Sequence, residues 1–218
     1  MKIETIHVAK KDLIFAASAG LLIGLLLLPV LKSAQPALYE QLFFATVPFF
    51  LIATPLGLIV AHEISKRIAL VWQLGKFGVT GVLNVLVDMG VLSLLIFFFK
   101  NIFQIEAKDL IFSGLSILTF YSLYKAISFI IANINSYYWN KYWTFDQNSD
   151  KKTEFFQFFI VSLLGFLINV AVASLTFYLA NPVGELKQGQ WGLIGAAMGS
   201  IVGLVWNFIG YKFIVFKK

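Results

Sequence analysis

Five long runs of apolar residues are the feature that most restricts the fold of this chain. An α-helix rises about 1.5 Å per residue and the hydrocarbon core of a bilayer is about 30 Å thick, so about 20 apolar residues can cross it. Each run reaches or approaches that length. The runs are residues 13–31, 42–61, 72–99, 155–180 and 191–215. They predict an all-α protein, a helical bundle that crosses a membrane several times.

The composition excludes a soluble globular domain. Hydrophobic residues make up 59% of the 218 positions, charged residues make up 13%, and the mean hydropathy is +0.84. A soluble domain has about 25% charged and about 45–50% apolar residues, so both values depart in the same direction. The chain has no cysteine and only two histidines, His7 and His62. Disulfides, thiol chemistry, a metal site and a cofactor are therefore not expected.

The stretch 110–139 is too long for a single transmembrane helix. As one helix it would measure about 45 Å and would place Lys125 in the middle of the membrane. We predict a break near Tyr121, with 110–120 at the outer surface and 123–142 crossing the membrane. In that arrangement the Lys125 side chain extends outward to the polar surface. The chain then has about six transmembrane helices.

The basic residues predict the orientation in the membrane. If the amino terminus is cytoplasmic, 12 of the 17 lysine and arginine residues lie on the cytoplasmic side and 5 lie outside. Lysine and arginine concentrate in the cytoplasmic loops of membrane proteins. This bias also explains the net charge of +6 without a nucleic-acid partner. We predict a multi-pass protein of the cytoplasmic membrane with both termini in the cytoplasm.

An internal repeat organises the last four predicted helices. Residues 76–88 align with 157–169 at an offset of 81, and residues 140–145 align with 211–216 at an offset of 71. The first copy is therefore longer by 10 residues, and the excess falls in the stretch where the break is predicted. Each copy contains two helices, so the two copies are predicted to have the same orientation. Repeats of this kind are related by an axis along the membrane normal.

The polar motifs of the repeat resemble those of the GtrA-like family. In the first copy they read Gly-Val-Leu-Asn-Val-Leu-Val-Asp at 81–88 and Asn-Ser-Tyr-Tyr-Trp-Asn-Lys-Tyr-Trp-Thr-Phe at 135–145. The second copy has Gly-Phe-Leu-Ile-Asn at 165–169 and Asn-Phe-Ile-Gly-Tyr-Lys-Phe-Ile-Val-Phe at 207–216. It departs from the family pattern at Tyr211, where the first copy has asparagine. The resemblance predicts a four-span domain over 71–218, preceded by a two-span extension of unknown role over 1–70.

The resemblance implies a role in the synthesis of cell-surface polysaccharides. Proteins similar to this chain are thought to move polyprenyl-phosphate-linked sugars, of the undecaprenyl phosphate type, across the membrane. The implied partners are this lipid-linked sugar, the membrane lipids and a glycosyltransferase. Self-association of the chain stays open. Two other functions remain in view: a membrane anchor that recruits a glycosyltransferase without transport, and a small exporter with Asp88 as its coupling acid.

Asp88 is the one acidic residue that we place inside a span. Intramembrane charges are costly, so they normally face a cavity or a charged partner. Asn84 lies four residues earlier and therefore on the same helix face. Asn169 is the counterpart of Asp88 in the second copy. An alternative role, hydrogen bonding between helices, applies to Asn169, Asn133 and Asn207. Gly81 and Gly165 are small residues that are expected to let helices approach closely.

Lys141 and Lys212 occupy equivalent positions at the predicted cytoplasmic ends of the two copies. A lysine ammonium is a compact charge that binds phosphate, although lysines beside spans also occur for orientation alone. Trp143 and Phe145 either stack on a sugar or anchor the interface. The residues predicted to bind the lipid phosphate and the substrate are Asn84, Asp88, Asn135, Asn140, Lys141, Trp143, Asn169, Asn207 and Lys212.

Enzymatic activity is not expected from this sequence. It has no Ser-His-Asp set, paired carboxylates, metal cluster or glycine-rich phosphate loop. The predicted cytoplasmic segment around 146–152 is too short to contain a catalytic domain. No catalytic residues are predicted.

Overall fold

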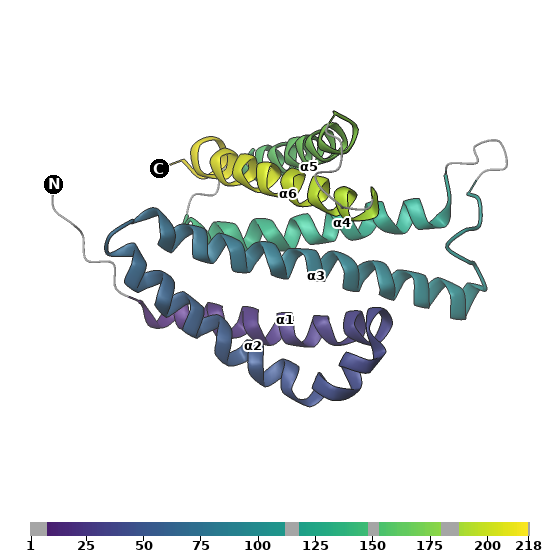
Figure 1. Ribbon diagram of the computed structural model, residues 1–218, viewed down its shortest axis with the longest axis horizontal. Helices are drawn as coiled ribbons and strands as arrows, with labels where there is room; N and C mark the ends of the chain where they lie inside the picture. The colour runs from purple at the N-terminus through teal and green to yellow at the C-terminus, as the bar shows by residue number, and fades with distance from the viewer. Residues whose placement is uncertain (1–7, 112–117, 148–152, 180–187, 218) are drawn as a thin grey trace. The chain divides into compact units, whose positions relative to one another are not determined.

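The computed structural model describes residues 8–111, 118–147, 153–179 and 188–217, which form helices joined by short connections (Figure 1). The helices are α1 (Lys10–Ala34), α2 (Pro36–Ser65), α3 (Leu70–Phe103), α4 (Phe120–Trp139), η1 (Asn140–Thr144), α5 (Glu154–Leu179), α6 (Gln188–Gly210) and η2 (Tyr211–Val215). The described residues contain no strand beyond one isolated bridge between Leu110 and Thr119. The all-α prediction is confirmed.

Five helices in the described part of the chain are long and apolar enough to cross a membrane. They cover residues 10–33, 36–65, 70–103, 154–178 and 194–215. The sixth long helix, α4, has 20 residues but carries Lys125 and several serine and asparagine residues. It packs along α3, where Lys125 and Ser128 both contact Asp88. The protein is therefore a multi-pass membrane protein with five to six spans.

The break predicted near Tyr121 is confirmed. Helix α4 begins at Phe120, where the Thr119 side chain accepts a hydrogen bond from the Ser122 amide at 3.4 Å. Such a cap satisfies one of the amides left without a helical partner at a helix start. Residues 112–117 of the predicted surface segment lie outside the described part. In the connection, the Lys108 ammonium lies 3.0 Å from Glu106 and lowers the pKa of that exposed carboxyl.

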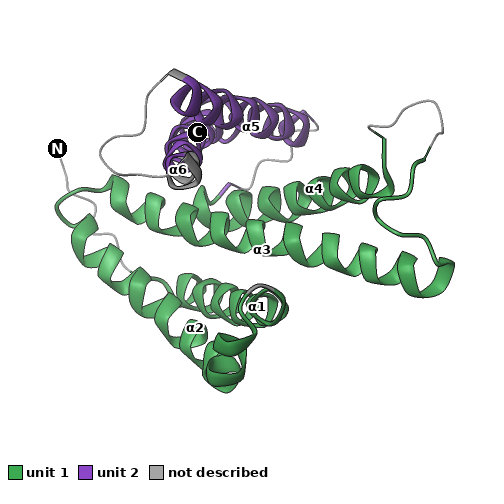
Figure 2. Ribbon diagram, turned by 45° about the vertical axis from the view of Figure 1, so that its right-hand side comes forward, with its two compact units in different colours: residues 1–146 green, residues 147–218 purple. Residues whose placement is uncertain are grey.

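The chain divides into two compact units, residues 1–146 and residues 147–218 (Figure 2). In unit 1, α3 packs against α1, α2 and α4. In unit 2, α5 packs against α6. We call α3, α4 and η1 the first hairpin, and α5, α6 and η2 the second hairpin. The open end of each is the end that carries its π-helix, η1 or η2. The predicted domain boundary at residue 70 stays a prediction.

A buried ion pair fastens α1 to the first hairpin. Lys76 Nζ lies 2.5 Å from Asp12 Oδ1, and the two side chains are 8% and 12% exposed. The same ammonium lies 3.4 Å from the Trp143 carbonyl oxygen and 4.4 Å from the centroid of the Trp72 ring. Phe15 of α1 stacks on Trp143 at 5.8 Å between centroids. The predicted extension thus shares a core with the first hairpin.

Both hairpins end in the same local structure. A π-helix of five residues begins at Asn140 in the first hairpin and at Tyr211 in the second. The Phe145 amide donates to the Asn140 carbonyl at 2.8 Å, and the Phe216 amide donates to the Tyr211 carbonyl at 2.7 Å. These positions are related by the offset of 71 that the sequence repeat predicts. π-Helical turns of this kind are rare and are often found at functional sites.

Candidate functional site

A seam of polar side chains runs between α3 and α4 inside the first hairpin. Helix α3 contributes three residues at a spacing of four, which places them on one face. Helix α4 and η1 contribute three residues that meet this face. The members of this polar seam are Thr80, Asn84, Asp88, Lys125, Ser128 and Thr144. Two cross-helix contacts anchor it: one at Asp88, and one between the hydroxyls of Thr80 and Thr144 at 3.4 Å.

Asp88 holds the centre of the seam through two partners on α4. Its carboxylate pairs with the Lys125 ammonium, and its Oδ1 accepts from the Ser128 hydroxyl at 2.6 Å. The prediction that the Lys125 side chain extends outward did not include Asp88 as its partner. A charge within a span is stabilised far more by an opposite charge close by than by a long reach to the surface. The pair is partly open, since the Asp88 side chain is 21% exposed and that of Lys125 is 44% exposed.

Asn84 lies one helical turn from Asp88 and has hydrogen-bonding capacity to spare. Its Oδ1 is buried and has no hydrogen-bond partner among the described residues. The same holds for Asn135 Nδ2 and Asn140 Oδ1, although the Asn140 amide nitrogen donates to the Ser136 carbonyl at 2.8 Å. Leaving a buried polar atom without a partner costs about 1–3 kcal/mol. A ligand hydroxyl or a water at Asn84 would remove that cost.

The predicted lysine of the first hairpin is buried at its open end. Lys141 is 4% exposed, and its Nζ donates to the Tyr137 hydroxyl at 3.2 Å. The ammonium also lies 5.5 Å and 5.8 Å from the ring centroids of Tyr137 and Tyr142. Aromatic rings at such distances stabilise a cation. The π-helix η1 sets this geometry by turning the lysine toward the aromatic side chains.

The equivalent lysine of the second hairpin is more accessible. Lys212 is half-buried, and its Nζ lies 5.6 Å from the Phe208 ring and 5.7 Å from the Phe213 ring. The two predicted lysines therefore share a π-helix and aromatic neighbours, each within its own unit. They differ in burial, which the sequence did not predict.

Trp143 lies in the core of unit 1. It is 1% exposed and contacts Phe15 and Trp139, while Phe145 is 4% exposed. Both aromatic residues were considered for sugar stacking or for anchoring at the membrane interface. Their burial means that a ligand reaches them only if the side chains around them move. A role of Trp143 in binding stays a prediction.

The second hairpin places its predicted asparagines against glycine backbone. A Cβ added to Gly199 would lie 2.7 Å from Asn169 Oδ1, and one added to Gly203 would lie 3.1 Å from Asn169 Cβ. A Cβ at Gly165 would overlap the amide of Asn207. Close approach of this kind is typical of small residues between transmembrane helices. The expectation for Gly165 is confirmed, whereas a Cβ at Gly81 would meet nothing within 4 Å.

Sequence reasoning missed Lys125 and Ser128 as partners of Asp88. An intramembrane lysine needs a counter-charge, and Asp88 was the one acid placed within a span, so the pair could have been proposed from these two residues alone. Thr144 was missed as well, although it lies in the motif that identified the repeat. Among the residues that the structure describes, no group of three acidic or histidine side chains could hold a metal ion.

Comparison with protein families gives one match. The model described as the GtrA/DPMS transmembrane domain matches residues 76–216, which begin at Lys76 and end at Phe216 after η2. The matched segment contains both hairpins, apart from the first six residues of α3, and all nine predicted binding residues. Searches among curated proteins and among solved structures gave no match.

Proposed function

The chain belongs to the GtrA/DPMS transmembrane-domain family, whose members act in glycosylation that uses polyprenyl-phosphate sugars, and we propose that it translocates such a lipid-linked sugar across the membrane. It acts in this proposal as a carrier without catalytic chemistry. The membrane is the cytoplasmic membrane, and the open ends of the hairpins, with both termini, face the cytoplasm.

The observation that carries this proposal is the partly open ion pair in the polar seam. A sugar is rich in hydroxyl groups, which donate to carboxylates and accept from ammonium groups. Asp88 and Lys125 supply one of each at the same place, and Asn84 adds a buried acceptor without a partner. A polar headgroup crossing the hydrocarbon region needs such partners, because unpaired polar groups there cost several kcal/mol, about the value for an unsatisfied backbone group.

The lipid phosphate would be held at the cytoplasmic open ends. We assign phosphate binding to Lys141 in the first hairpin and to Lys212 in the second, each considered within its own hairpin and each beside aromatic rings. Asn135 Nδ2 is a buried donor without a partner among the described residues and is available to a phosphate oxygen, whereas Asn140 Oδ1 is an acceptor and would bond a sugar hydroxyl. In this proposal the ammonium groups attract the phosphate charge, and the side-chain amides orient the bound headgroup by hydrogen bonds.

Reconstitution tests the proposal directly. Purified protein in liposomes is given a labelled polyprenyl-phosphate sugar, and an external reagent reports how fast the sugar becomes accessible. The variant Asp88→Asn combined with Lys125→Ala keeps the seam neutral while removing both charges. We expect translocation to fall by about 10- to 100-fold, since a charge-assisted hydrogen bond contributes about 1.5–3 kcal/mol.

Asn133→Ala is the matched control, because Asn133 also lies in α4 but its amide donates to the Phe129 carbonyl of its own helix at 3.0 Å. This variant should translocate at the rate of the unchanged protein. Equal rates for the seam variant and the control would contradict transport through the seam. Binding of a glycosyltransferase without any translocation would favour the anchoring function instead.

A further inference from the structure

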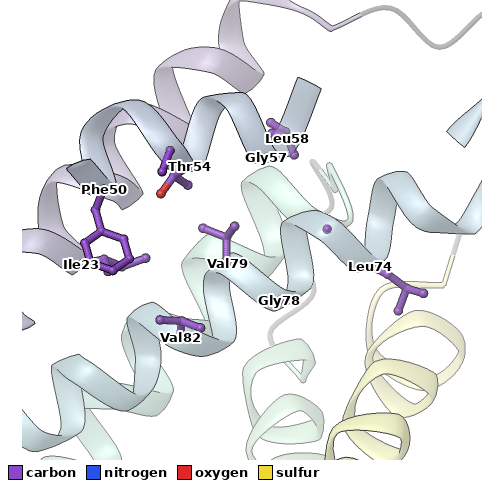
Figure 3. A pocket seen from close by; sticks show the side chains of 11 residues that line it. Ile23, Phe50, Thr54, Gly57, Leu58, Leu74, Gly78, Val79 and Val82 are labelled. Carbon is purple, nitrogen blue, oxygen red and sulfur yellow. The ribbon is translucent and has the colours of Figure 1, made fainter. Parts of the chain in front are cut away.

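An apolar groove lies in unit 1, on a different face of α3 from the polar seam. It has a volume of about 450 Å³, which is toward the lower end for small-molecule sites. Figure 3 shows Phe50 and Thr54 of α2 facing Val79 and Val82 of α3 across it. Ile23 of α1 also lines the groove, and Thr54 is the one polar residue in its lining.

Glycines hold this groove open. A Cβ added to Gly57 of α2 or to Gly78 of α3 would meet nothing within 4 Å. Glycines between transmembrane helices normally serve close packing, as Gly24 does here, whose Cβ would lie 2.8 Å from Val47 Cα. Gly57 and Gly78 make no such contact, so their effect is to leave space on opposite walls of the groove.

Within the predicted span 42–61, the α2 residues that line the groove run from Phe50 near the middle to Leu58 near the end, which places the groove in one leaflet. It extends along α2 from Phe50 to Leu58, a rise of about 12 Å, which is less than half of the hydrocarbon thickness of about 30 Å. That leaflet is the one next to the turn between α2 and α3. Its mainly apolar lining suits a hydrocarbon chain.

The turn next to the groove carries positive charge. Lys66 pairs with Glu63 at 2.7 Å, whereas Arg67 is exposed and has no ion-pair partner among the described residues. An apolar groove beneath a cationic turn is complementary to a molecule with an anionic headgroup and a hydrocarbon chain. An arginine guanidinium binds phosphate in a bidentate manner.

We propose that the groove binds the hydrocarbon chain of a polyprenyl phosphate whose phosphate group lies at Arg67. The identity of the chain rests on the proposed function; the site itself does not. Helices α1 and α2 lie outside residues 76–216, so the family match does not supply this site. It gives the extension a role: with α3 it stores or delivers the lipid beside the translocating hairpin. A volume of about 450 Å³ is small for the two acyl chains of a phospholipid, which favours a single isoprenoid chain.

Photochemical labelling tests this site. The probe is a short-chain polyprenyl phosphate that carries a diazirine in its hydrocarbon chain, applied to the full chain in phosphatidylethanolamine vesicles. We expect cross-links at Ile23, Val79 and Val82, and competition by unlabelled polyprenyl phosphate but not by phosphatidylglycerol. Equal competition by phosphatidylglycerol would overturn the proposal, since the groove would then hold any anionic lipid.

A filled groove should lose the label. In Gly78→Leu the new side chain occupies the space of at least two chain carbons, so labelling should weaken by about tenfold. Gly81→Leu is the matched control, because Gly81 lies in the same helix with nothing within 4 Å of an added Cβ but does not line the groove. Gly57→Leu tests the opposite wall, and thermal unfolding in detergent checks that each variant folds.

The outcomes separate this inference from the proposed function. Groove cross-links that Gly78→Leu removes, in a protein that moves no sugar, would support the site and contradict translocation. Translocation with cross-links spread evenly over lipid-facing positions would support the function and overturn the site. Equal labelling of the folded Gly78→Leu and Gly81→Leu variants would also overturn it.

Discussion

The two hairpins follow one sequence repeat, yet an ion pair joins the helices of the first, while close glycine packing joins those of the second at the equivalent positions. At equivalent positions the first has Asp88 and Ser128, and the second has Asn169 and Gly199. These equivalent positions meet in both hairpins. Asp88 accepts a hydrogen bond from Ser128, whereas Asn169 packs on Gly199. The first copy therefore has the charged Asp88, which Lys125 neutralises. The counterpart of Lys125 in the second copy is Ala196. The second copy has neutral side chains and a close backbone approach.

This difference indicates a division of roles within the repeat. Glycine packing lets the helix backbones of the second hairpin approach closely, which leaves little space between them for a ligand. An ion pair that is partly open can exchange its partners for those of a ligand. The open ends stay alike, with a π-helix and a lysine in each hairpin. The two copies therefore differ in the middle of the hairpin and agree at the open end.

The largest effect is expected where the first hairpin meets α1. The second hairpin has Gln157 at the position of Lys76, so Lys76→Gln imports its residue. The substitution leaves the Asp12 carboxylate buried without its counter-charge. Loss of one partner of a buried pair costs about 3–5 kcal/mol. We expect a lower thermal midpoint of the purified protein in detergent.

The double variant Asp12→Asn with Lys76→Gln serves as the control for this substitution. It removes both charges, so most of the lost stability should return. A single variant as stable as the unchanged protein would contradict the buried ion pair. The contact of α1 with the first hairpin would then rest on apolar packing such as that of Phe15 on Trp143.

The second-largest effect concerns the two lysines at the open ends. If both hold a lipid phosphate, then Lys141→Gln and Lys212→Gln should each weaken binding of a short-chain polyprenyl-phosphate sugar by about 10- to 100-fold. Lysine to arginine should restore part of the affinity, because the charge and the donors remain. A binding titration at fixed salt measures this effect.

Lys100 at the far end of α3 gives a matched exposed lysine for the titration. Lys100→Gln should change the affinity little, because water and salt screen an exposed charge. Equal, small changes at all three positions would leave orientation in the membrane as the sole role of these lysines.

A third prediction compares a glycine-to-alanine substitution in each hairpin. Gly199→Ala pushes a Cβ against the Asn169 side chain and backbone, and overpacking of this kind costs about 1–3 kcal/mol. Gly81→Ala in the first hairpin meets nothing within 4 Å, and alanine favours the helix by about 1 kcal/mol over glycine. Thermal unfolding should therefore move in opposite directions. A shift in the same direction for both would show that the hairpins pack alike.

The sequence predicted the helices well because their length and apolarity are local properties. It also predicted the break before α4, because the 10 additional residues of the first copy do not fit within a helix that crosses the membrane once. It did not predict the pairing of Asp88 with Lys125, because that pairing depends on how α3 and α4 are rotated about each other. Asp12 was missed for another reason: it sits at the edge of an apolar run, where a carboxylate normally meets water.

The glycines show the same limit from the other side. Gly81 and Gly165 were both interpreted as packing residues from their place in the repeat, and only Gly165 contacts a neighbouring helix. A glycine has no side chain and so leaves space beside its backbone. The tertiary structure decides whether backbone, lipid or ligand fills that space. The groove beside Gly57 and Gly78 could not be predicted for this reason.

The smallest effect is expected at the Thr80–Thr144 contact in the polar seam. The second hairpin has Val161 at the position of Thr80, so Thr80→Val imports its residue with little change of shape. The hydroxyl contact is long, at 3.4 Å, and hydrogen bonds between transmembrane helices contribute about 0.6 kcal/mol on average. We expect a loss of stability of about that size and an unchanged rate of translocation, because the charged pair at Asp88 lies two turns away and remains intact. Thermal unfolding and the liposome assay together measure the two quantities. A rate that falls as steeply as in the Asp88 variant would mean that the sugar passes Thr80 as well, so that the whole seam rather than its centre conducts the headgroup.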